Sequence, residues 1–328
     1  METIVITGAA GYIGGATVLE LRNNYNVIGI DTRNNPTISS LCSNFILGDF
    51  DVVITQKFLR DHDVKAIIHC AGLSQVGPSV EYPDLYYGEN VQKTLNLLNK
   101  IISLKKLYED TYNPRLIFSS SASVYETKYE LLDETSELEP ISPYAKTKLS
   151  VEYAINDYAK AYNIKYNILR YFNVCGAVES EGIMHGQDQS SMHIFSSIFD
   201  ASMKNKEFTI NGHSYDTKDG TCERDYVHVY DVAKLHRLCI ERKIDGTFNV
   251  GSGIGTTNLE CVHAVVSTLQ KEIIYNFAQE REGDAAKLVA DISKTKHMFG
   301  WQPSNSNIQY VIESLNNWYN SKYFKGLI

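Results

Sequence analysis

Short apolar runs alternate with longer amphipathic stretches through the first half of this chain. The runs lie at 4–7, 27–30, 45–47, 66–70, 116–118 and 166–169, and many of their residues are Val, Ile, Leu or Phe. Strands separated by helices run parallel, and a parallel sheet is covered on both faces, so its strands are apolar throughout. The pattern therefore predicts an α/β fold built on a doubly wound parallel sheet.

The pattern changes after Asn173. Residues 174–191 are rich in Gly, Glu, Ser and Gln without periodicity, which is typical of a long loop. Beyond it we expect a helix near 192–203, a strand at 208–210 and a helix near 258–270, while a strand near 246–251 returns to the first sheet. Because 328 residues exceed the usual size of one domain, we predict a first domain at 1–174, completed by the returning strand, and a smaller C-terminal α/β domain at 175–328.

A glycine turn follows the first apolar run and precedes an amphipathic segment. Gly8, Gly11 and Gly14 allow a tight turn and a close backbone approach to a pyrophosphate, which the following helix N-terminus attracts. The next strand ends in Asp31, where a Rossmann-type fold carries the acid that binds the adenosine ribose. Asp31 favours NAD, because a carboxylate repels the 2′-phosphate of NADP. Two other interpretations stay open: Arg33 can accommodate that phosphate, and Asp31 can merely cap a turn.

Small and polar residues stand where the other predicted strands end. Ligands of an open parallel sheet bind in the crevice outside the carboxyl ends of its strands, so we expect a ligand near these residues. His69 lies inside one of the apolar runs, and we interpret it as a core histidine. The strand ends carry Gly48-Asp49-Phe50, Cys70-Ala71-Gly72, Ser119 to Ser121 and Arg170 to Asn173.

Tyr144 and Lys148 stand one helical turn apart, after Ser142 and Pro143, which are typical of a helix start. An ammonium ion beside a phenol favours the phenolate and lowers the pKa of the tyrosine, so the pair can transfer a proton. A strand that ends in Ser119 to Ser121 can present a hydroxyl to the same substrate oxygen. The spacing recurs at Tyr230 and Lys234, a pair we interpret as chance because no serine-tipped strand leads into it.

Composition excludes several classes of protein. The chain is 43% hydrophobic and 21% charged, and none of its apolar runs approaches the roughly 18 residues that span a membrane. It begins without a basic leader, so we expect a cytoplasmic location. A formal charge of -8 disfavours nucleic acid as a partner. Six widely spaced cysteines suggest reduced thiols, and we expect no metal site.

Taken together, these motifs resemble the UDP-glucose 4-epimerase (UDP-galactose 4-epimerase) family of extended short-chain dehydrogenases/reductases. The resemblance runs nearly end to end. It rests on the segments 7–14, 69–73, 118–125, 142–148, 169–173, 219–229 and 281–284. The first four mark the superfamily, and the last three bring in the sugar-nucleotide epimerases.

The resemblance implies an isomerase that keeps NAD tightly bound. Tyr144 would take the proton of the sugar 4-hydroxyl while C4 passes its hydride to the nicotinamide. Lys148 would hold the cofactor ribose and lower the pKa of Tyr144, and Ser121 would hydrogen-bond the reacting oxygen. The 4-keto sugar would then rotate in the site and take the hydride back on its other face, which inverts C4.

The resemblance also implies two sets of binding residues. The cofactor set is Gly8, Gly11, Tyr12, Ile13, Gly14, Asp31, Asp49, Phe50, Cys70, Ala71, Gly72, Asn90, Ser119, Tyr144, Lys148 and Tyr171. The substrate set is Ser121, Tyr144, Asn173, Arg224, Tyr226, Arg281, Asp284 and Leu288. Within it, Asn173, Arg224 and Arg281 fall at phosphate-binding positions and Asp284 at the uridine ribose. The second domain would accordingly bind the nucleotide sugar, and the partner of the chain would be a UDP-sugar.

Four positions depart from the family pattern: Ser74, Ser191, Asn211 and Leu288. They leave other UDP-sugars open as substrates, namely N-acetylhexosamines, pentoses or uronates, although the bulk of Leu288 disfavours an N-acetyl group. A nucleotide-sugar 4,6-dehydratase is disfavoured because Ala122-Ser123 replaces the Asp-Glu of those enzymes. A non-catalytic NAD-binding sensor is the alternative from another class.

The resemblance further implies a homodimer. Two helices would form its interface as a four-helix bundle across a two-fold axis, the helix that carries Tyr144 and the one near 85–107.

Overall fold

Seven strands form one sheet in the computed structural model of the chain, which describes residues 1–108, 112–126, 131–187, 193–280 and 284–325. The strand order is β12-β6-β5-β4-β1-β2-β3, and the pairs β1–β2, β1–β4, β4–β5 and β2–β3 are parallel. The predicted α/β fold with a doubly wound parallel sheet is confirmed. The strands are β1 (Thr3–Thr7), β2 (Asn26–Asp31), β3 (Asn44–Leu47), β4 (Val64–His69), β5 (Arg115–Ser121), β6 (Tyr166–Tyr171) and β12 (Gly246–Val250).

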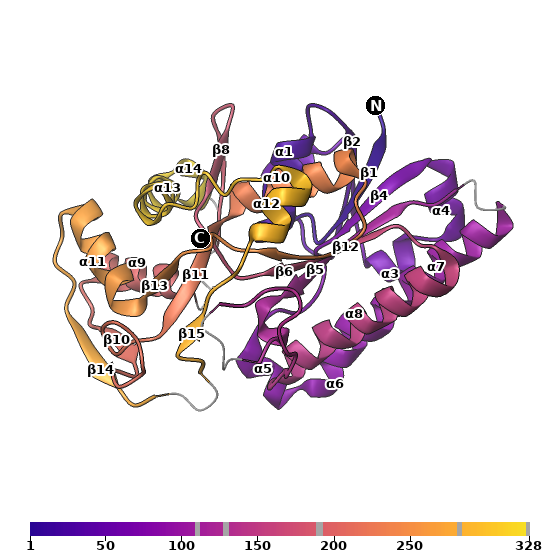
Figure 1. The fold of residues 1–328 in the computed structure, drawn as a ribbon. Coiled ribbons are helices and arrows are strands. Elements are labelled where there is room, and N and C mark those ends of the chain that lie inside the picture. Colours follow the sequence, from indigo (N-terminus) through magenta and orange to yellow (C-terminus); the bar gives the residue numbers. More distant parts are fainter. Residues whose placement is uncertain (109–111, 127–130, 188–192, 281–283, 326–328) are drawn as a thin grey trace. The chain divides into compact units, whose positions relative to one another are not determined.

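By its internal contacts the chain divides into two units (Figure 1). The first comprises 1–125, 137–170 and 233–248, and the second comprises 126–136, 171–232 and 249–328. The chain therefore passes from one unit to the other several times.

Helices cover the sheet of the first unit. Its core joins Ile67 of β4 and Leu116 of β5 to Leu97 and Ile101 of α7 and to Val151 of α8. Figure 1 shows α7 and α8 running alongside one another. Because β1 is buried at every residue, its continuous apolar run agrees with a sheet covered on both faces. The helices are α1 (Tyr12–Leu21), α2 (Pro36–Leu41), α3 (Phe50–Val53), α4 (Gln56–Asp61), α5 (Val76–Glu81), α6 (Pro83–Tyr86), α7 (Lys93–Leu107), α8 (Pro143–Tyr162) and most of α10 (Val229–Arg242).

The second unit contains small sheets and a separate core. Strand β11 (Glu223–His228) pairs antiparallel with β13 (Gly255–Thr257) and parallel with β7 (Asn173–Cys175) and β15 (Lys287–Leu288). Strands β10 (Phe208–Asn211) and β14 (Tyr275–Ala278) form a parallel pair, and β8 (Val178–Ser180) and β9 (Ile183–His185) form an antiparallel one. The unit is thus α/β as well, but with short strands.

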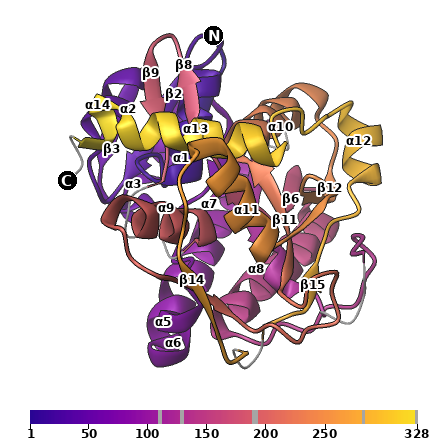
Figure 2. The same cartoon turned by 90° about the vertical axis from the view of Figure 1, so that its left-hand side faces the viewer.

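Helices α9 (Ile194–Lys204) and α13 (Ile308–Asn320) both contact α11 (Asn258–Leu269), as Figure 2 shows. Phe199, Val265 and Trp318 are among the buried side chains that join these three helices into the core of the second unit. Two shorter helices, α12 (Ser293–Phe299) and α14 (Lys322–Lys325), complete the unit. Within the described ranges, no helix is both long enough and apolar enough to cross a membrane.

Candidate active site

The turn between β1 and α1 leaves no space for a side chain at Gly8 or Gly14. Gly8 has a φ of +70°, and a Cβ at this position would lie 2.7 Å from the backbone nitrogen of Ala71. A Cβ on Gly14 would lie 2.1 Å from the carbonyl oxygen of Gly8. Gly11 is the N-cap of α1 and has no side chain with which to cap the first N–H groups of the helix. The turn fits a pyrophosphate, which needs a close backbone approach and available N–H groups.

Asp31 is held beside this turn at the end of β2. One carboxylate oxygen accepts a hydrogen bond from Ala10 N at 3.0 Å, and the other accepts one from Arg33 N at 2.9 Å. The Arg33 side chain is 71% exposed, with Nε 3.9 Å from the Asp31 carboxylate. Asp31 therefore does cap a local turn, and its hydrogen bond to Ala10 N also links it to the glycine turn.

Several other predicted cofactor residues of the first unit lie after the carboxyl ends of β1, β3 and β4 or near that of β5. Asp49 is the N-cap of α3 and forms an ion pair with Lys93. The set comprises Tyr12 and Ile13 in the first turn of α1, Asp49 and Phe50 after β3, Cys70, Ala71 and Gly72 after β4, and Ser119 near the end of β5.

His69 is part of the core behind this edge. Its Nδ1 lies 2.7 Å from Thr7 Oγ1 and its Nε2 lies 3.0 Å from Thr94 Oγ1. Burial, together with the charge of Lys148, lowers the pKa of His69 to about 3. The ring is therefore neutral at physiological pH and is held between two hydroxyls, which agrees with its interpretation as a core histidine.

Asn90 lies in a π-helical turn, from which its side chain points toward the chain that follows β4. The prediction placed one helix over 85–107, but the structure has α6, a π-helical turn η1 (Tyr87–Gln92) and then α7. From η1, the Asn90 carboxamide accepts from Leu73 N at 2.8 Å and donates to Leu73 O at 3.0 Å and Thr147 Oγ1 at 3.1 Å. Such turns are frequent at functional sites. This one ties the chain after β4 to α8.

The helix start predicted at Ser142 and Pro143 is confirmed. Ser142 Oγ accepts a hydrogen bond from Ala145 N at 3.2 Å, and Pro143 is the first residue of α8. One turn apart on this helix, Tyr144 and Lys148 are 9% and 7% exposed. The Lys148 ammonium group donates to Ser119 O at 2.9 Å and lies 5.9 Å from the centre of the Tyr144 ring. The first turns of α8 are therefore joined to the end of β5.

Ser121 completes the cluster. Its hydroxyl oxygen accepts from Ser123 N at 3.2 Å and from Ser123 Oγ at 2.9 Å. With these donors on its oxygen, the Ser121 hydroxyl can donate its own proton, and its interaction with the Tyr144 phenol acts to lower the pKa of Tyr144. The structure thus brings Ser121, Tyr144 and Lys148 together, as the sequence predicted.

The electrostatics of the cluster differ from the expectation in one respect. We expected Lys148 to lower the pKa of Tyr144, whereas burial raises the pKa of Tyr144 and the hydrogen bond from Ser121 acts against that rise. Burial also lowers the pKa of Lys148, to about 8, against the opposing effects of Cys70 and Glu152. The cause is the dry surroundings, which disfavour the charged form of each group.

The second unit holds the predicted substrate residues Asn173, Arg224, Tyr226, Asp284 and Leu288, and also Tyr171 from the cofactor set. Arg224 lies opposite Leu288 in the pairing of β11 with β15. Its guanidinium group donates to Ala285 O at 2.7 Å and lies 4.0 Å from the Asp284 carboxylate. The structure therefore brings Arg224, Asp284 and Leu288 together.

Tyr226 and Asn173 lie opposite one another in the pairing of β11 with β7. The Tyr226 ring packs edge-on against Phe195, 5.0 Å between centres, and belongs to the core of the second unit. Two positions that the sequence singled out, Arg281 and Ser191, lie outside the described residues.

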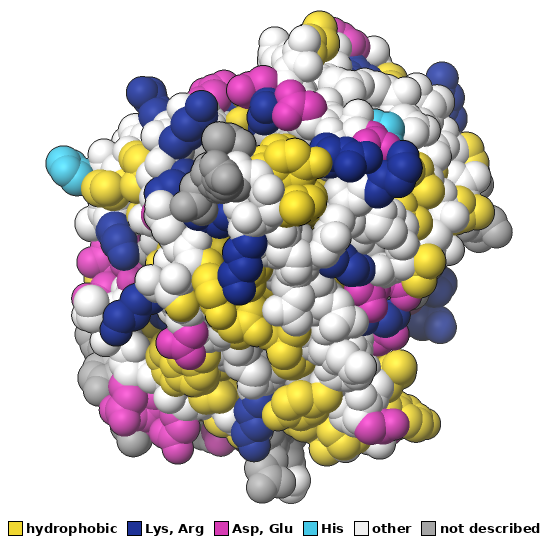
Figure 3. Space-filling view, turned by 90° about the vertical axis from the view of Figure 1, so that its right-hand side faces the viewer, with side chains coloured by type: hydrophobic (Ala, Val, Ile, Leu, Met, Phe, Trp, Pro, Cys, Tyr) yellow, Lys and Arg dark blue, Asp and Glu magenta, His cyan; other side chains and the backbone are white. Residues whose placement is uncertain are grey.

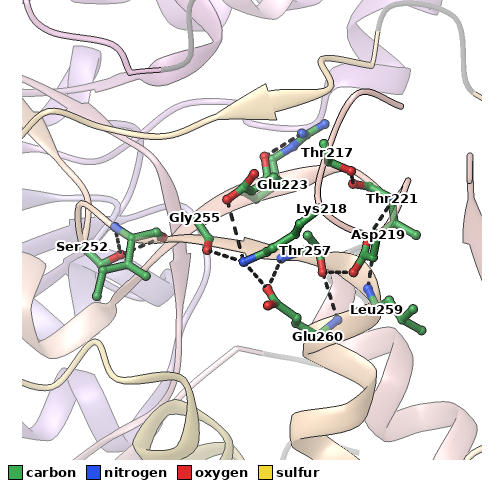
Figure 4. Close-up of polar contacts among 12 residues, drawn as sticks. Thr217, Lys218, Asp219, Thr221, Glu223, Ser252, Gly255, Thr257, Leu259 and Glu260 are labelled. Carbon is green, nitrogen blue, oxygen red and sulfur yellow. Dashed lines mark hydrogen bonds and ion pairs between the residues drawn. The ribbon is translucent and has the colours of Figure 1, made fainter. Parts of the chain in front are cut away.

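A polar cluster fixes the segment that leads into Arg224 (Figure 4). Lys218 forms an ion pair with Glu260 at 2.8 Å, and Thr221 N donates to Asp219 at 2.9 Å. The hydroxyl of Thr257, the N-cap of α11, donates to the same Asp219 carboxylate. We call Lys218, Asp219, Thr257 and Glu260 the α11 clamp, because together they attach the segment before β11 to the start of α11.

Sequence reasoning missed two sets of buried polar residues. The first is Asp225, next to Arg224, which accepts from Ser252 Oγ at 2.7 Å, Gly253 N at 2.9 Å and Ala290 N at 3.2 Å. The second is Glu152, which forms an ion pair with Arg170; we expected Arg170 at a strand end near a ligand, and the structure buries it against this carboxylate. A signal was available for the second set, because Glu152 stands one turn after Lys148 and Arg170 interrupts an apolar strand. No cluster of His, Cys, Asp and Glu within the described part of the chain suits a metal ion.

Comparison with known proteins connects this geometry to a family. Residues 4–251 match the NAD dependent epimerase/dehydratase family. The UDP-glucose 4-epimerase of Lactobacillus helveticus is 34% identical over 329 residues, covering 97% of each chain.

Two solved structures extend this likeness to the fold. The UDP-glucose 4-epimerase of Bifidobacterium longum in complex with NAD+ and UDP is 31% identical, with a TM-score of 0.83 over 98% of this chain and 99% of that one. The UDP-glucose 4-epimerase of Stenotrophomonas maltophila with bound NAD and formylated UDP-arabinopyranose is 27% identical, with a TM-score of 0.87 over 97% and 98%.

Proposed function

Because this chain belongs to the NAD dependent epimerase/dehydratase family, we propose that it is an NAD-dependent UDP-glucose 4-epimerase, which interconverts UDP-glucose and UDP-galactose by inverting C4. The observation that carries the proposal is the meeting of Ser121, Tyr144 and Lys148 between β5 and α8, in the unit that also holds the glycine turn. Relatives that match over nearly the whole chain are UDP-glucose 4-epimerases.

The residues of the first unit would hold NAD as follows. The turn at Gly8, Gly11 and Gly14 would bind the pyrophosphate, and Asp31 would accept the hydroxyls of the adenosine ribose. Lys148 would donate to the nicotinamide ribose while it keeps its bond to Ser119 O. When NAD is bound, it supplies a reversible hydride acceptor.

Tyr144 is the proton carrier in this proposal. Its phenolate would take the proton of the sugar 4-hydroxyl as C4 loses its hydride, giving a 4-keto sugar, and would return the proton after the ketone has turned its other face. Ser121 assists because its hydrogen bond favours the phenolate, against a raised pKa that otherwise keeps the phenol neutral. Lys148, as long as it is protonated, adds a positive charge on the same side of α8.

The second unit would bind the nucleotide sugar. Arg224 suits a phosphate because its planar group donates two parallel, charge-assisted hydrogen bonds. Its bond to Ala285 O holds it beside Asp284, the residue proposed for the uridine ribose. Asn173 and Arg281 are proposed for the other phosphate contacts, and Leu288 is proposed to limit the room at C2 of the sugar.

A homodimer and a cytoplasmic location complete the proposal. Large apolar side chains are exposed on α5, α6, η1 and α8, among them Val80, Leu85, Tyr87 and Tyr153. Figure 3 shows hydrophobic side chains gathered over the lower part of one face, and a patch of this kind is typical of an interface. All six cysteines are free thiols, which suits a reducing compartment. Sedimentation velocity tests the dimer; a monomer at micromolar concentration would contradict it.

The function is tested by incubating the purified protein with UDP-glucose and no added NAD. UDP-galactose should form and approach a constant ratio to UDP-glucose, because cofactor stays bound through turnover. A panel of UDP-N-acetylhexosamines, UDP-pentoses and UDP-uronates, resolved into C4 epimers, measures specificity. Preferential epimerisation of another sugar would replace the proposed substrate, and loss of water to a 4-keto-6-deoxy sugar would indicate dehydratase chemistry.

A further inference from the structure

Three polar residues with no role in the proposed chemistry are buried together behind it. Ser120, Glu152 and Arg170 are 3%, 1% and 4% exposed. Arg170 Nη2 lies 2.6 Å from one Glu152 oxygen, and Arg170 Nε lies 3.1 Å from the other. The Ser120 hydroxyl donates to the same carboxylate. We call these three residues the buried triad.

Each member of the triad stands next to a residue of the candidate site. Ser120 lies between Ser119, whose carbonyl oxygen accepts a hydrogen bond from Lys148, and Ser121, whose side chain acts to lower the pKa of Tyr144. Its neighbours on β5 thus contact the cluster, and its partner Glu152 lies on α8, the helix that carries Tyr144 and Lys148. The triad joins the two elements that must keep their spacing for the proton transfer to work.

Glu152 and Arg170 complete this connection. Glu152 is four residues after Lys148, on the same side of α8. Arg170 is in β6, and its guanidinium group stacks on the Tyr125 ring at 4.8 Å. The triad therefore links β5, α8 and β6 through charge-assisted hydrogen bonds, which are stronger than neutral ones.

Stability alone does not account for such a group. Withdrawing two charges from water is costly, and apolar residues of similar volume often serve a fold as well as a buried ion pair does. We infer that Ser120, Glu152 and Arg170 are positioning residues of the proposed epimerase reaction, which fix the end of β5 against α8 and keep a carboxylate one turn from Lys148. The inference rests on the proposed function and extends it to residues that do not touch substrate or cofactor.

The charge of Glu152 has a specific consequence. The groups around Lys148 are His69 and Cys70 at the end of β4, Tyr144 and Glu152 on α8, and Arg170 beyond Glu152. His69 is neutral because burial lowers its pKa to about 3, and burial raises the pKa of Cys70 to about 11, so this thiol is also neutral. Glu152 is accordingly the carboxylate that supports the Lys148 ammonium ion. Without it, Lys148 would lose its proton at lower pH.

The experiment compares Glu152→Gln with Asp157→Asn, which removes an exposed carboxylate from the same helix. Glutamine keeps the shape of glutamate and can still accept from Ser120. In Glu152→Gln we expect kcat for UDP-glucose to fall about tenfold, and the alkaline limb of the kcat–pH profile to move down by roughly half a pH unit or more, with KM and bound NAD unchanged. Asp157→Asn should leave the profile unchanged. A uniform loss at every pH, or a limb that does not move, would overturn the role of the charge.

A second variant, Ser120→Ala, tests the positioning role even if Glu152→Gln fails to fold. This variant removes one donor and leaves the ion pair intact, so we expect kcat to fall several-fold, roughly in line with one lost hydrogen bond, while KM and the limb stay unchanged. A kcat equal to that of the unmodified protein would overturn the positioning role. If the unmodified protein does not epimerise UDP-glucose, the proposed function fails instead, so the two failures are distinguishable.

Discussion

Lys148 in the first unit and Arg224 in the second are both cations that donate to a backbone carbonyl oxygen, yet their surroundings differ. Lys148 is buried, with the Glu152 carboxylate one helical turn away, and burial lowers its pKa to about 8. Arg224 lies on a short strand, 4.0 Å from the Asp284 carboxylate, and follows the segment that the α11 clamp attaches to α11. Arginine keeps its charge in any such setting, whereas a buried lysine can lose its proton.

The difference separates two tasks. A group that takes part in proton transfer is best shielded from water. In surroundings of low polarity its pKa depends strongly on each neighbouring charge. A group that binds a phosphate needs a permanent charge and a fixed orientation.

Tyr144→Phe should lower kcat by about three orders of magnitude, since it removes the proton carrier and little else. Bound NAD, released by denaturation and quantified, should remain near one per chain, and the affinity for UDP should not change. A variant that keeps most of its activity would show that Tyr144 is not the proton carrier. If the Tyr144→Phe variant lacks epimerase activity but still performs the biological function of the unmodified protein, the protein acts as an NAD-binding sensor.

Arg224→Met should weaken UDP binding by roughly 10- to 100-fold, the effect of losing charge-assisted hydrogen bonds to a phosphate. Isothermal titration calorimetry with UDP measures the change. Arg237→Met is the matched control, because Arg237 pairs with Glu20 and Glu241 in the first unit. If Arg224→Met and Arg237→Met bind UDP with equal affinity, Arg224 does not bind the phosphate.

Acid should destabilise the protein through the buried histidines of the first unit. The pKa values of His69 and His236 are lowered to about 3, so between that value and the ordinary 6.5 the unfolded chain binds more protons than the folded one. The free energy of unfolding therefore falls as the pH drops below 6.5, by about 2 kcal/mol for each histidine at pH 5.

Urea unfolding at pH 7 and pH 5 measures this loss. His236→Gln should remove about half of the pH dependence that the two histidines cause, and the exposed His62→Gln should remove none of it. Equal pH dependence in both variants would mean that His236 is not a source of the acid sensitivity.

Lys218→Met should have the smallest effect. Lys218 and Glu260 are 48% and 43% exposed, so their ion pair contributes under about 1 kcal/mol to stability. We expect UDP affinity to fall at most a few-fold, and the difference to shrink further in 0.5 M salt as charges are screened. A loss as large as that of Arg224→Met would show that the α11 clamp, and not Arg224 alone, determines phosphate binding.

Local chemistry made several features of the first unit predictable. The glycine turn, Asp31 at a strand end, and the helix start at Ser142 and Pro143 each follow from the conformations that a few adjacent residues favour. Tyr144 and Lys148 were identified because helical spacing places residues four apart on one face. The choice of Tyr144 and Lys148 over the equally spaced Tyr230 and Lys234 also depended on the strand that ends in Ser119 to Ser121.

Features that depend on residues far apart were not predictable in the same way. Glu152 and Arg170 are 18 positions apart and meet only after α8 has packed on the sheet. The direction of the Tyr144 pKa depends on burial, which a sequence motif does not reveal. The α11 clamp likewise joins residues 218–219 to 257–260, across a strand and a loop.

The π-helical turn η1 has a consequence for the geometry of the helix that follows. It accommodates one residue more per turn than an α-helix would, which rotates everything after it by about 100°. Asn90 in the turn can therefore point toward Leu73 while Leu97 and Ile101 of α7 still meet the sheet. After a single-residue deletion within 87–92, either Asn90 would no longer point toward Leu73 or α7 would no longer face the sheet with Leu97 and Ile101. The length of this segment is therefore constrained as well as its composition.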